Sequence, residues 1–149
     1  GYHNNPEETA KTLKDGWIYT GDICEMDADG YFYVVDRLKD MVIVSGFNVF
    51  TRQVDEVLME HPDIDMAATI GLPDPKRPGS EIVASAIVLR SGIEKSSRMK
   101  DEITEYMRSK VAPYKIPRVI EFRDELPTSP VGKVLKRELR KEMLAENGI

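Results

Sequence analysis

The sequence predicts an α+β fold in which helices cover a mixed or antiparallel sheet. The first observation is the order of apolar segments after residue 40, which indicates hairpin, helix, strand, strand, helix, strand and helix. The second is the composition, because 41% hydrophobic and 32% charged residues in a chain of 149 are typical of a globular protein with its own core. No internal repeat or low-complexity tract interrupts this pattern.

The first forty residues differ from the rest and predict a short helix followed by a β-hairpin. Pro6 favours the start of a helix that runs from about Glu7 to Leu13. Two strand-like runs then flank the turn Asp27–Gly30, and the second run is rich in aromatic and β-branched residues: WIYTGDICEM and YFYVVDR.

The aspartates of this turn raise the question of a calcium site. Against the twelve-residue EF-hand loop, Asp27, Asp29 and Gly30 fall at positions three, five and six. However, position one is Glu25, and position twelve is Asp36 in place of the longer glutamate. The flanks also predict strands where an EF-hand has helices. We therefore interpret the segment as a hairpin turn and predict no metal there.

The segments after residue 40 predict a compact domain, element by element. Met41–Val44 and Phe47–Phe50 are expected to be strands around a tight turn at Ser45–Gly46, and Thr51 is expected to cap a helix that runs to about Glu60. The remaining elements are strands over 64–74 and 81–92, a helix over 96–113 with Met99, Ile103, Tyr106 and Met107 inward, a strand over 118–127, and a helix from Val134 to about Asn147.

Charge and targeting features narrow the class of protein. A net charge of −5 argues against a nucleic-acid-binding protein. The basic stretch near the C-terminus is interpreted as the solvated face of an amphipathic helix: Lys133, Lys136, Arg137, Arg140 and Lys141. No run approaches the roughly 20 apolar residues that span a bilayer, and no signal peptide is present, so we expect a cytoplasmic protein whose membrane contact, if any, is peripheral.

The few cysteine and histidine residues give no metal site. Cys24 cannot form a disulfide within the chain and fits a reducing compartment, while Cys24, His3 and His61 lack the spacing of zinc ligands. We therefore predict no metal ligands in these residues. The chain begins with Gly1 instead of methionine, which indicates either a piece cut from a longer protein or a processed N-terminus.

Lys133 lies in a Gly-Lys pair, but the surrounding residues exclude a phosphate-binding P-loop. That motif requires a glycine five residues before the pair and a Ser or Thr after the lysine. Here those positions are Pro127 and Val134, and proline has no backbone N–H to offer a phosphate. The role of Lys133 needs another explanation.

Four stretches stand in order along the chain: GYHNNPEET at the start, GWIYTGD, DRLKD running into SG, and PTSPVGK. Together they resemble the C-terminal end of adenylate-forming enzymes, the superfamily of acyl-CoA synthetases, luciferases and nonribosomal adenylation domains. The resemblance is closest to bacterial fatty-acyl-CoA ligases. The resemblance implies that residues 1–38 are the tail of a large ATP-binding domain, that residues 39–149 are a mobile C-terminal domain, and that Lys39 is the hinge between them.

The resemblance also implies a role for each matching residue. Lys133 would be catalytic, entering the active site to bridge the substrate carboxylate and the α-phosphate of ATP. Thr20, Gly21, Asp22 and Arg37 would bind ATP or AMP, and Ser45, Gly46 and Phe47 would line the channel for coenzyme A. ATP with Mg²⁺ would be held mainly by the N-terminal domain of the full-length enzyme, and coenzyme A would be the second substrate.

Some positions depart from the family pattern, and more than one function remains open. Thr51 replaces a frequent proline, Gln53–Asp55 replaces a more acidic pattern, and Lys39 stands where many relatives have aspartate. The first hypothesis is the C-terminal portion of an acyl-CoA synthetase for a fatty or other aliphatic acid, inactive by itself. The alternatives are an aryl-CoA ligase, an adenylation domain that loads a carrier protein, or a non-catalytic interaction module that kept the fold.

Overall fold

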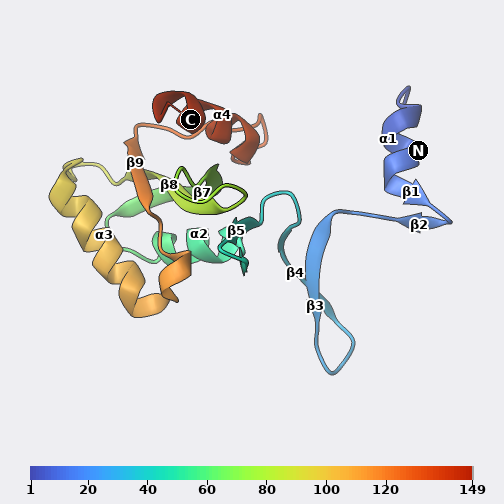
Figure 1. Cartoon of the computed structure of the whole chain (residues 1–149), viewed down its shortest axis with the longest axis horizontal. Coiled ribbons are helices and arrows are strands. Elements are labelled where there is room, and N and C mark those ends of the chain that lie inside the picture. Colours follow the sequence, from blue (N-terminus) through green and yellow to red (C-terminus); the bar gives the residue numbers. More distant parts are fainter. Residues whose placement is uncertain (149) are drawn as a thin grey trace. The chain divides into compact units, whose positions relative to one another are not determined.

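The computed structural model describes residues 1–148 and divides the chain into two compact units, Gly1–Lys39 and Asp40–Ile149. The first unit contains helix α1 (Pro6–Thr12) and two antiparallel strand pairs. The pairs are β1 (Leu13–Lys14) with β2 (Trp17–Ile18), and β3 (Asp22–Met26) with β4 (Phe32–Arg37) (Figure 1). The predicted short helix and the predicted hairpin are therefore both present.

The turn between β3 and β4 is organised by the Asp27 carboxylate. Its Oδ1 accepts hydrogen bonds from the backbone N–H groups of Asp29 at 3.0 Å and Tyr31 at 2.9 Å, and its Oδ2 accepts one from the Tyr33 hydroxyl at 2.9 Å. Gly30 has φ +87°, which glycine adopts without steric cost. Asp27 thus binds its own turn, between strands, and the hairpin interpretation is confirmed over the EF-hand.

The second unit is built around a three-stranded sheet in the order β7–β8–β9 (Figure 1). The β7–β8 pair is antiparallel and the β8–β9 pair is parallel, which confirms the predicted mixed sheet. The elements of this unit, in chain order, are β5 (Val42–Val44), β6 (Phe47–Val49), α2 (Thr51–Met59), β7 (Ile64–Pro73), β8 (Glu81–Leu89), α3 (Ser97–Lys110), a 3₁₀ turn (Pro113–Lys115), β9 (Val119–Arg123) and α4 (Lys136–Glu146).

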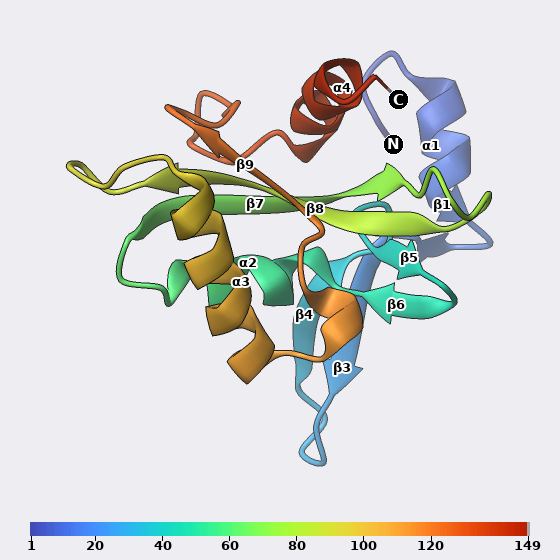
Figure 2. The same ribbon diagram turned by 60° about the vertical axis from the view of Figure 1, so that its left-hand side comes forward.

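Both faces of this sheet are buried. Side chains of a strand alternate between its two faces, so neighbouring residues of one strand belong to different cores. On β8, Val83 and Ile87 belong to one apolar core, while Ile82 and Ala84 belong to the other. The first core also contains residues of α2 and α3, and the second contains residues of α4. Figure 2 shows the resulting three layers, with α4 on one side of the sheet and α2 and α3 on the other.

Two predicted helix starts are wrong, and in each case a tertiary contact explains the difference. Thr51 does not cap α2: the cap position is Phe50, and the Thr51 hydroxyl accepts a hydrogen bond from Lys136 Nζ at 2.8 Å. Helix α4 begins at Lys136 instead of Val134, because Val134 forms an antiparallel bridge with Thr128.

The interpretation of the C-terminal basic residues as a solvated face is also wrong for two of them. Lys136 Nζ lies 2.7 Å from Asp55 Oδ2, and only 20% of its side chain is exposed. Arg140 donates from Nε to the Gly71 carbonyl at 2.8 Å and from Nη2 to Glu81 Oε1 at 3.2 Å. Both cations lie on the inner side of α4, because Leu139, which stands between them in the sequence, is fully buried.

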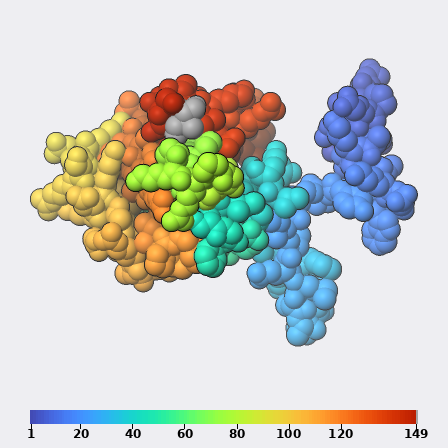
Figure 3. Space-filling view, in the orientation of Figure 1, coloured from blue at the N-terminus to red at the C-terminus, as the bar shows by residue number. Residues whose placement is uncertain are grey.

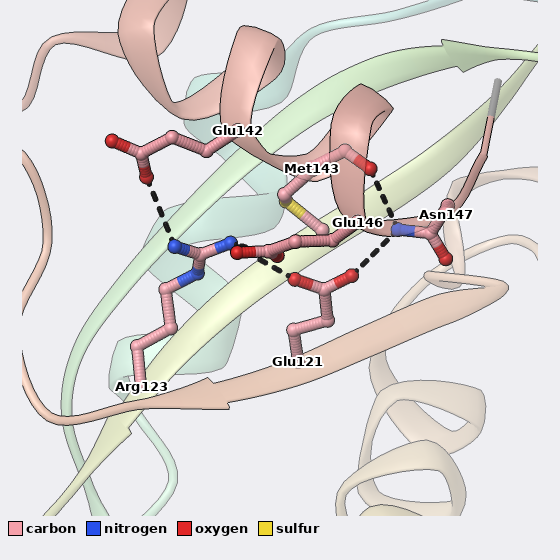
Figure 4. A network of polar contacts seen from close by, with 6 residues as sticks. All are labelled: Glu121, Arg123, Glu142, Met143, Glu146 and Asn147. Atoms are coloured by element: carbon pink, nitrogen blue, oxygen red, sulfur yellow. Dashed lines mark hydrogen bonds and ion pairs between the residues drawn. The ribbon is translucent and has the colours of Figure 1, made fainter.

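The C-terminal end of α4 is attached to β9 by a network of charged groups (Figure 4). The guanidinium of Arg123 forms ion pairs with the carboxylates of Glu121, Glu142 and Glu146. Asn147 donates from Nδ2 to Glu121 Oε1 at 2.7 Å. The Glu121 carboxylate raises the pKa of Glu146, because it accepts a hydrogen bond from the protonated Glu146 carboxyl group. This end of the helix is therefore held by several contacts at once.

Glu81 joins three elements near the middle of α4. Its Oε1 accepts from Arg140, and its Oε2 accepts from the backbone N–H of Ile43 in β5 at 3.2 Å. The carboxylate lies over Gly71, where an added Cβ would approach both carboxylate oxygens to within 2.9 Å. In the space-filling view, the red atoms of the α4 region lie directly on the green atoms of the β7–β8 region (Figure 3). Because Gly71 has no side chain, the Glu81 carboxylate can occupy the space above it.

We predict that Asp27 titrates below the usual range for aspartate. The Tyr31 N–H is the largest cause of the lowered pKa, with the Tyr33 hydroxyl and the Asp29 N–H acting in the same direction. A lowered folded pKa means that the ionised group stabilises the hairpin above the unfolded pKa, and that this contribution is lost as the pH falls through the folded pKa. NMR titration of the carboxyl carbon should show this, with Tyr33→Phe raising the pKa; an unchanged pKa would contradict it.

We predict that Gly71→Ala lowers the free energy of unfolding by about 1–3 kcal/mol, because the new methyl group displaces the Glu81 carboxylate from Arg140 and Ile43. Denaturant unfolding measures this effect. The matched control is the same substitution in a Glu81→Ala background, where no carboxylate is left to displace. An equal cost in both backgrounds would show that the strand itself, and not Glu81, resists the methyl group.

Candidate functional site

The residues predicted to bind the nucleotide lie together at the open end of the β3–β4 hairpin. Asp22 and Arg37 are opposite each other in the strand pairing, and Arg37 Nε donates to Asp22 Oδ1 at 3.3 Å. The Thr20 hydroxyl accepts the Asp22 N–H at 3.1 Å, and the Gly21 carbonyl accepts the N–H of Leu38 at 2.8 Å.

This arrangement leaves both charged groups able to bind a ligand. The side chains of Asp22 and Arg37 are 28% and 54% exposed. A carboxylate can accept about four hydrogen bonds, so one contact with Arg37 leaves room for two hydroxyl donors such as those of a ribose. Gly21 lies between Thr20 and the first residue of β3, and its φ of +75° is a left-handed conformation that glycine adopts without steric cost.

The residues predicted to line a channel form the tight turn between β5 and β6. Ser45 has φ +50° and Gly46 has φ +89°, so both central residues have the positive φ of a type I′ hairpin turn. Serine is uncommon in that conformation, and two contacts support it here. The Ser45 N–H donates to Ser80 Oγ at 2.9 Å, and Arg77 Nη1 donates to Ser45 Oγ at 2.6 Å.

A pocket of about 240 Å³ opens beside this turn, and Ser45, Phe47, Tyr114 and Arg118 are among its lining residues. The rings of Phe47 and Tyr114 are stacked, with centroids 4.7 Å apart and planes at 15°. The pocket is smaller than the roughly 300–1,000 Å³ typical of small-molecule sites, so it could hold part of a ligand or a narrow chain.

Three further residues, which no sequence pattern indicated, are brought to this turn from distant segments by the fold: Tyr114, Arg77 and Arg118. Tyr114 lies in the 3₁₀ turn after α3, and Arg77 lies in the loop between β7 and β8. The only local signal was a proline on either side of residues 114–116, which indicates an ordered turn but no ligand.

Lys133 lies on a closed loop that precedes α4. The Ser129 carbonyl accepts the N–H of Gly132 at 2.8 Å, and the Ser129 N–H donates to the Lys133 carbonyl at 2.8 Å. Gly132 has φ +77°, as the residue after such a turn often has. The Lys133 side chain is exposed, and within residues 1–148 its ammonium group forms no hydrogen bond or ion pair.

The structure therefore separates the predicted site residues into distinct groups. Thr20, Gly21, Asp22 and Arg37 are in the first unit, and Lys39 is its last residue. The Ser45–Phe47 turn and Lys133 are on two different loops of the second unit. Among the described residues, no three His, Cys, Asp or Glu side chains gather as a metal site, and no helix is long and apolar enough to cross a membrane.

Comparison with known proteins gives one family and many similar enzymes. Residues 53–133 match the family described as the AMP-binding enzyme C-terminal domain. A long-chain-fatty-acid–CoA ligase of Bacillus subtilis (strain 168) is 45% identical over 142 residues, which are 95% of this chain and 24% of that protein. A feruloyl-CoA synthase of an Amycolatopsis species is 43% identical over 142 residues, 95% of this chain and 28% of that protein.

A solved structure resembles the chain as a whole. An anthranilate CoA ligase in complex with anthranoyl-AMP matches with a TM-score of 0.87 and 34% identity, over 98% of this chain and 28% of that one. The chain thus spans about a quarter of the length of these relatives. The α+β fold expected from the sequence is the fold of the corresponding part of that enzyme.

Proposed function

Because this chain belongs to the AMP-binding enzyme C-terminal domain family, we propose that it works as the C-terminal portion of an ATP-dependent acyl-CoA synthetase. In the first half-reaction, a carboxylate oxygen attacks the α-phosphorus of ATP and pyrophosphate leaves. In the second, the thiol of coenzyme A loses its proton and attacks the acyl carbon, and AMP leaves. The product is the acyl thioester.

The observation that supports this proposal best is the division of the chain after Lys39. The pair Asp22–Arg37, suited to a nucleotide, lies in one unit, and both functional loops lie in the other. If Lys39 is the hinge, rotation of the second unit can present either loop to a nucleotide held by the first unit. One domain could then serve both half-reactions in turn.

Lys133 is the residue we assign to adenylation. Two anions, the carboxylate and the α-phosphate, must approach each other in that step, and an ammonium group between them lowers their repulsion and stabilises the charge that develops. The exposed Lys133 side chain on an ordered loop is suited to enter a site formed by other residues. We propose no ligand from this chain for the Mg²⁺ that accompanies ATP.

The Ser45–Phe47 turn is the surface we assign to thioester formation. An added Cβ at Gly46 would meet no atom within 4 Å, so the space above the turn is open. The neighbouring pocket is narrow and partly aromatic, and Arg77 and Arg118 place positive charge beside it. These features suit a narrow arm that ends in a phosphorylated nucleotide, which is the chemistry of coenzyme A.

We also propose that residues 1–38 belong to the large ATP-binding domain of the full-length protein. Several large apolar side chains of this segment remain exposed, including Trp17 at 74% and Phe32 at 71%. Exposed apolar residues in such density mark surfaces that normally contact other protein.

We expect the acid to be a fatty or other aliphatic acid, because the 45% identical relative is a long-chain-fatty-acid–CoA ligase. An aromatic acid is the second candidate, favoured by the feruloyl and anthranilate ligases among the relatives. Pyrophosphate release by the full-length protein should be faster with saturated fatty acids than with ferulate or anthranilate. The reverse order would replace the first candidate with the second.

We predict that substitutions in the two loops impair different half-reactions of the full-length enzyme. Lys133→Ala should slow acyl-adenylate formation by roughly two to three decades, or about 3–4 kcal/mol, the scale for losing one charge-stabilising group. It should leave transfer from a pre-made acyl-adenylate to coenzyme A nearly unchanged. Gly46→Leu should leave acyl-adenylate formation nearly unchanged and slow the transfer of the acyl group to coenzyme A. Pyrophosphate release and thioester formation are measured separately.

The matched control for the turn is Gly46→Ala. Alanine and leucine strain the backbone equally at φ +89°, and neither meets a protein atom at Cβ, so a larger loss with leucine reports obstruction of a ligand. If Lys133→Ala and Gly46→Leu depress both half-reactions equally, the assignment of separate roles to the two loops is wrong.

A further inference from the structure

The N-terminal end of α4 is not explained by its own sequence. The cap residue, Leu135, offers no side-chain hydrogen bond, and the first helical residue is Lys136. A cation at this end faces the positive end of the helix dipole, which is unfavourable, and Glu138 in the first turn offsets only part of this effect. A contact in addition to the Thr128–Val134 bridge therefore helps to fix the residue at which α4 begins.

That contact is made by the Lys136 side chain. Its ammonium donates to Asp55 Oδ2 at 2.7 Å and to Thr51 Oγ1 at 2.8 Å, both on α2. Thr51 is fully buried and the Asp55 side chain is 12% exposed. Burial raises the pKa of Asp55, and the charge of Lys136 opposes this effect. The ion pair is thus largely removed from water, where leaving one partner alone is costly.

This ion pair connects two layers of the domain. Helix α2 contributes Val54 and Leu58 to the core on one face of the sheet, and α4 contributes Leu139 and Met143 to the core on the other. Both helices pack against the edge strand β7. Lys136 is the first residue of α4, so its attachment to α2 fixes the position of the helix start relative to the sheet.

Hydrogen bonds within the loop before α4 fix the position of Lys133 relative to the start of the helix. Leu135 donates its N–H to the Pro127 carbonyl at 2.7 Å, and Lys133 is bonded through its carbonyl to the Ser129 N–H at 2.8 Å. The bridge between Thr128 and Val134 closes the loop between these contacts. The backbone of the loop is therefore one hydrogen-bonded piece that ends at Lys136.

We propose that Lys136 is a positioning residue that holds the Lys133 loop in the orientation needed for adenylation. The proposal rests on the function proposed above for Lys133. Lys136 itself is not expected to contact a substrate. It acts through α2, Asp55 and Thr51, and its loss allows the loop to shift while the far end of α4 stays attached to β9.

The test is a double-substitution cycle in the full-length enzyme, measured as ATP–pyrophosphate exchange with saturating acid. Lys136→Met should reduce the kcat of adenylation by about tenfold to a hundredfold, the scale of a misplaced catalytic group. In a Lys133→Ala background the same substitution should change the rate by less than about twofold. Transfer from a pre-made acyl-adenylate to coenzyme A should keep its rate.

Three further variants separate positioning from loss of folding. Asp55→Asn combined with Lys136→Met removes both buried charges, which preserves stability better than removing one, and should still slow adenylation. Lys136→Arg should recover part of the rate, because it can still pair with Asp55. Lys141→Met is the control, since Lys141 is on the same helix and, among residues 1–148, pairs only with its neighbour Glu138.

Each outcome has one meaning. Equal losses from Lys136→Met with and without Lys133, or equal losses in both half-reactions, overturn the positioning role and leave the role of Lys133 intact. If Lys133→Ala alone does not slow adenylation, the proposed function of Lys133 fails, and the positioning role of Lys136 fails with it.

Discussion

The antiparallel pairing of β7 with β8 is the constraint on which the rest of the second unit depends. These strands are ten and nine residues long, and both faces of β8 consist mainly of buried apolar side chains. A sheet of this kind is stable only when each face is covered. Helices α2 and α3 cover one face, and the chain must then cross to the other face to place α4 there. The loop with Lys133 is part of that crossing.

The same constraint explains why charged residues occur on the inner side of α4. Leu139 and Met143 fill the apolar core, while Lys136, Arg140 and the C-terminal carboxylates contact polar groups around it. The Lys136–Asp55 pair is largely removed from water and is favourable only because the two charges are placed opposite each other, whereas the side chains of Arg140, Glu142 and Glu146 stay about half exposed. The helix is therefore held in one orientation by paired charges, in addition to apolar burial.

The elements of the fold could be predicted from the sequence because their signals are local. The nearly continuous apolar run of β8 is typical of a strand buried on both faces. The spacing of Ile103 and Met107 reflects the helical period of α3, and both of these residues are buried. The roles of Thr51, Lys136 and Arg140 could not be predicted in this way. Their partners lie 59–85 positions away in the sequence, so local capping and amphipathicity rules gave the wrong result.

The residues of the candidate site also divide into those with a local sequence signal and those that only the fold brings together. Lys133, Asp22 and Gly46 were found because they lie in short motifs that resemble a known family, and their assigned roles stay predictions. Tyr114 and Arg77 reach the Ser45–Phe47 turn only through the fold, and Arg77 is 32 positions from Ser45. No pattern of spacing indicates such a meeting. A sequence without its fold could therefore suggest the turn but not the pocket beside it.

The central claim is that one domain turns about Lys39 to present two loops in succession. It is tested most directly by a distance between the two units, measured by pulsed EPR in the full-length enzyme. Spin labels at Glu7→Cys and Lys141→Cys, both exposed positions in this chain, report this distance once Cys24 and any other native cysteine of the full-length protein have been replaced by serine. If the domain turns in this way, two distances are expected, one dominant with ATP and acid and the other with acyl-adenylate and coenzyme A. A single distance under all conditions would contradict it.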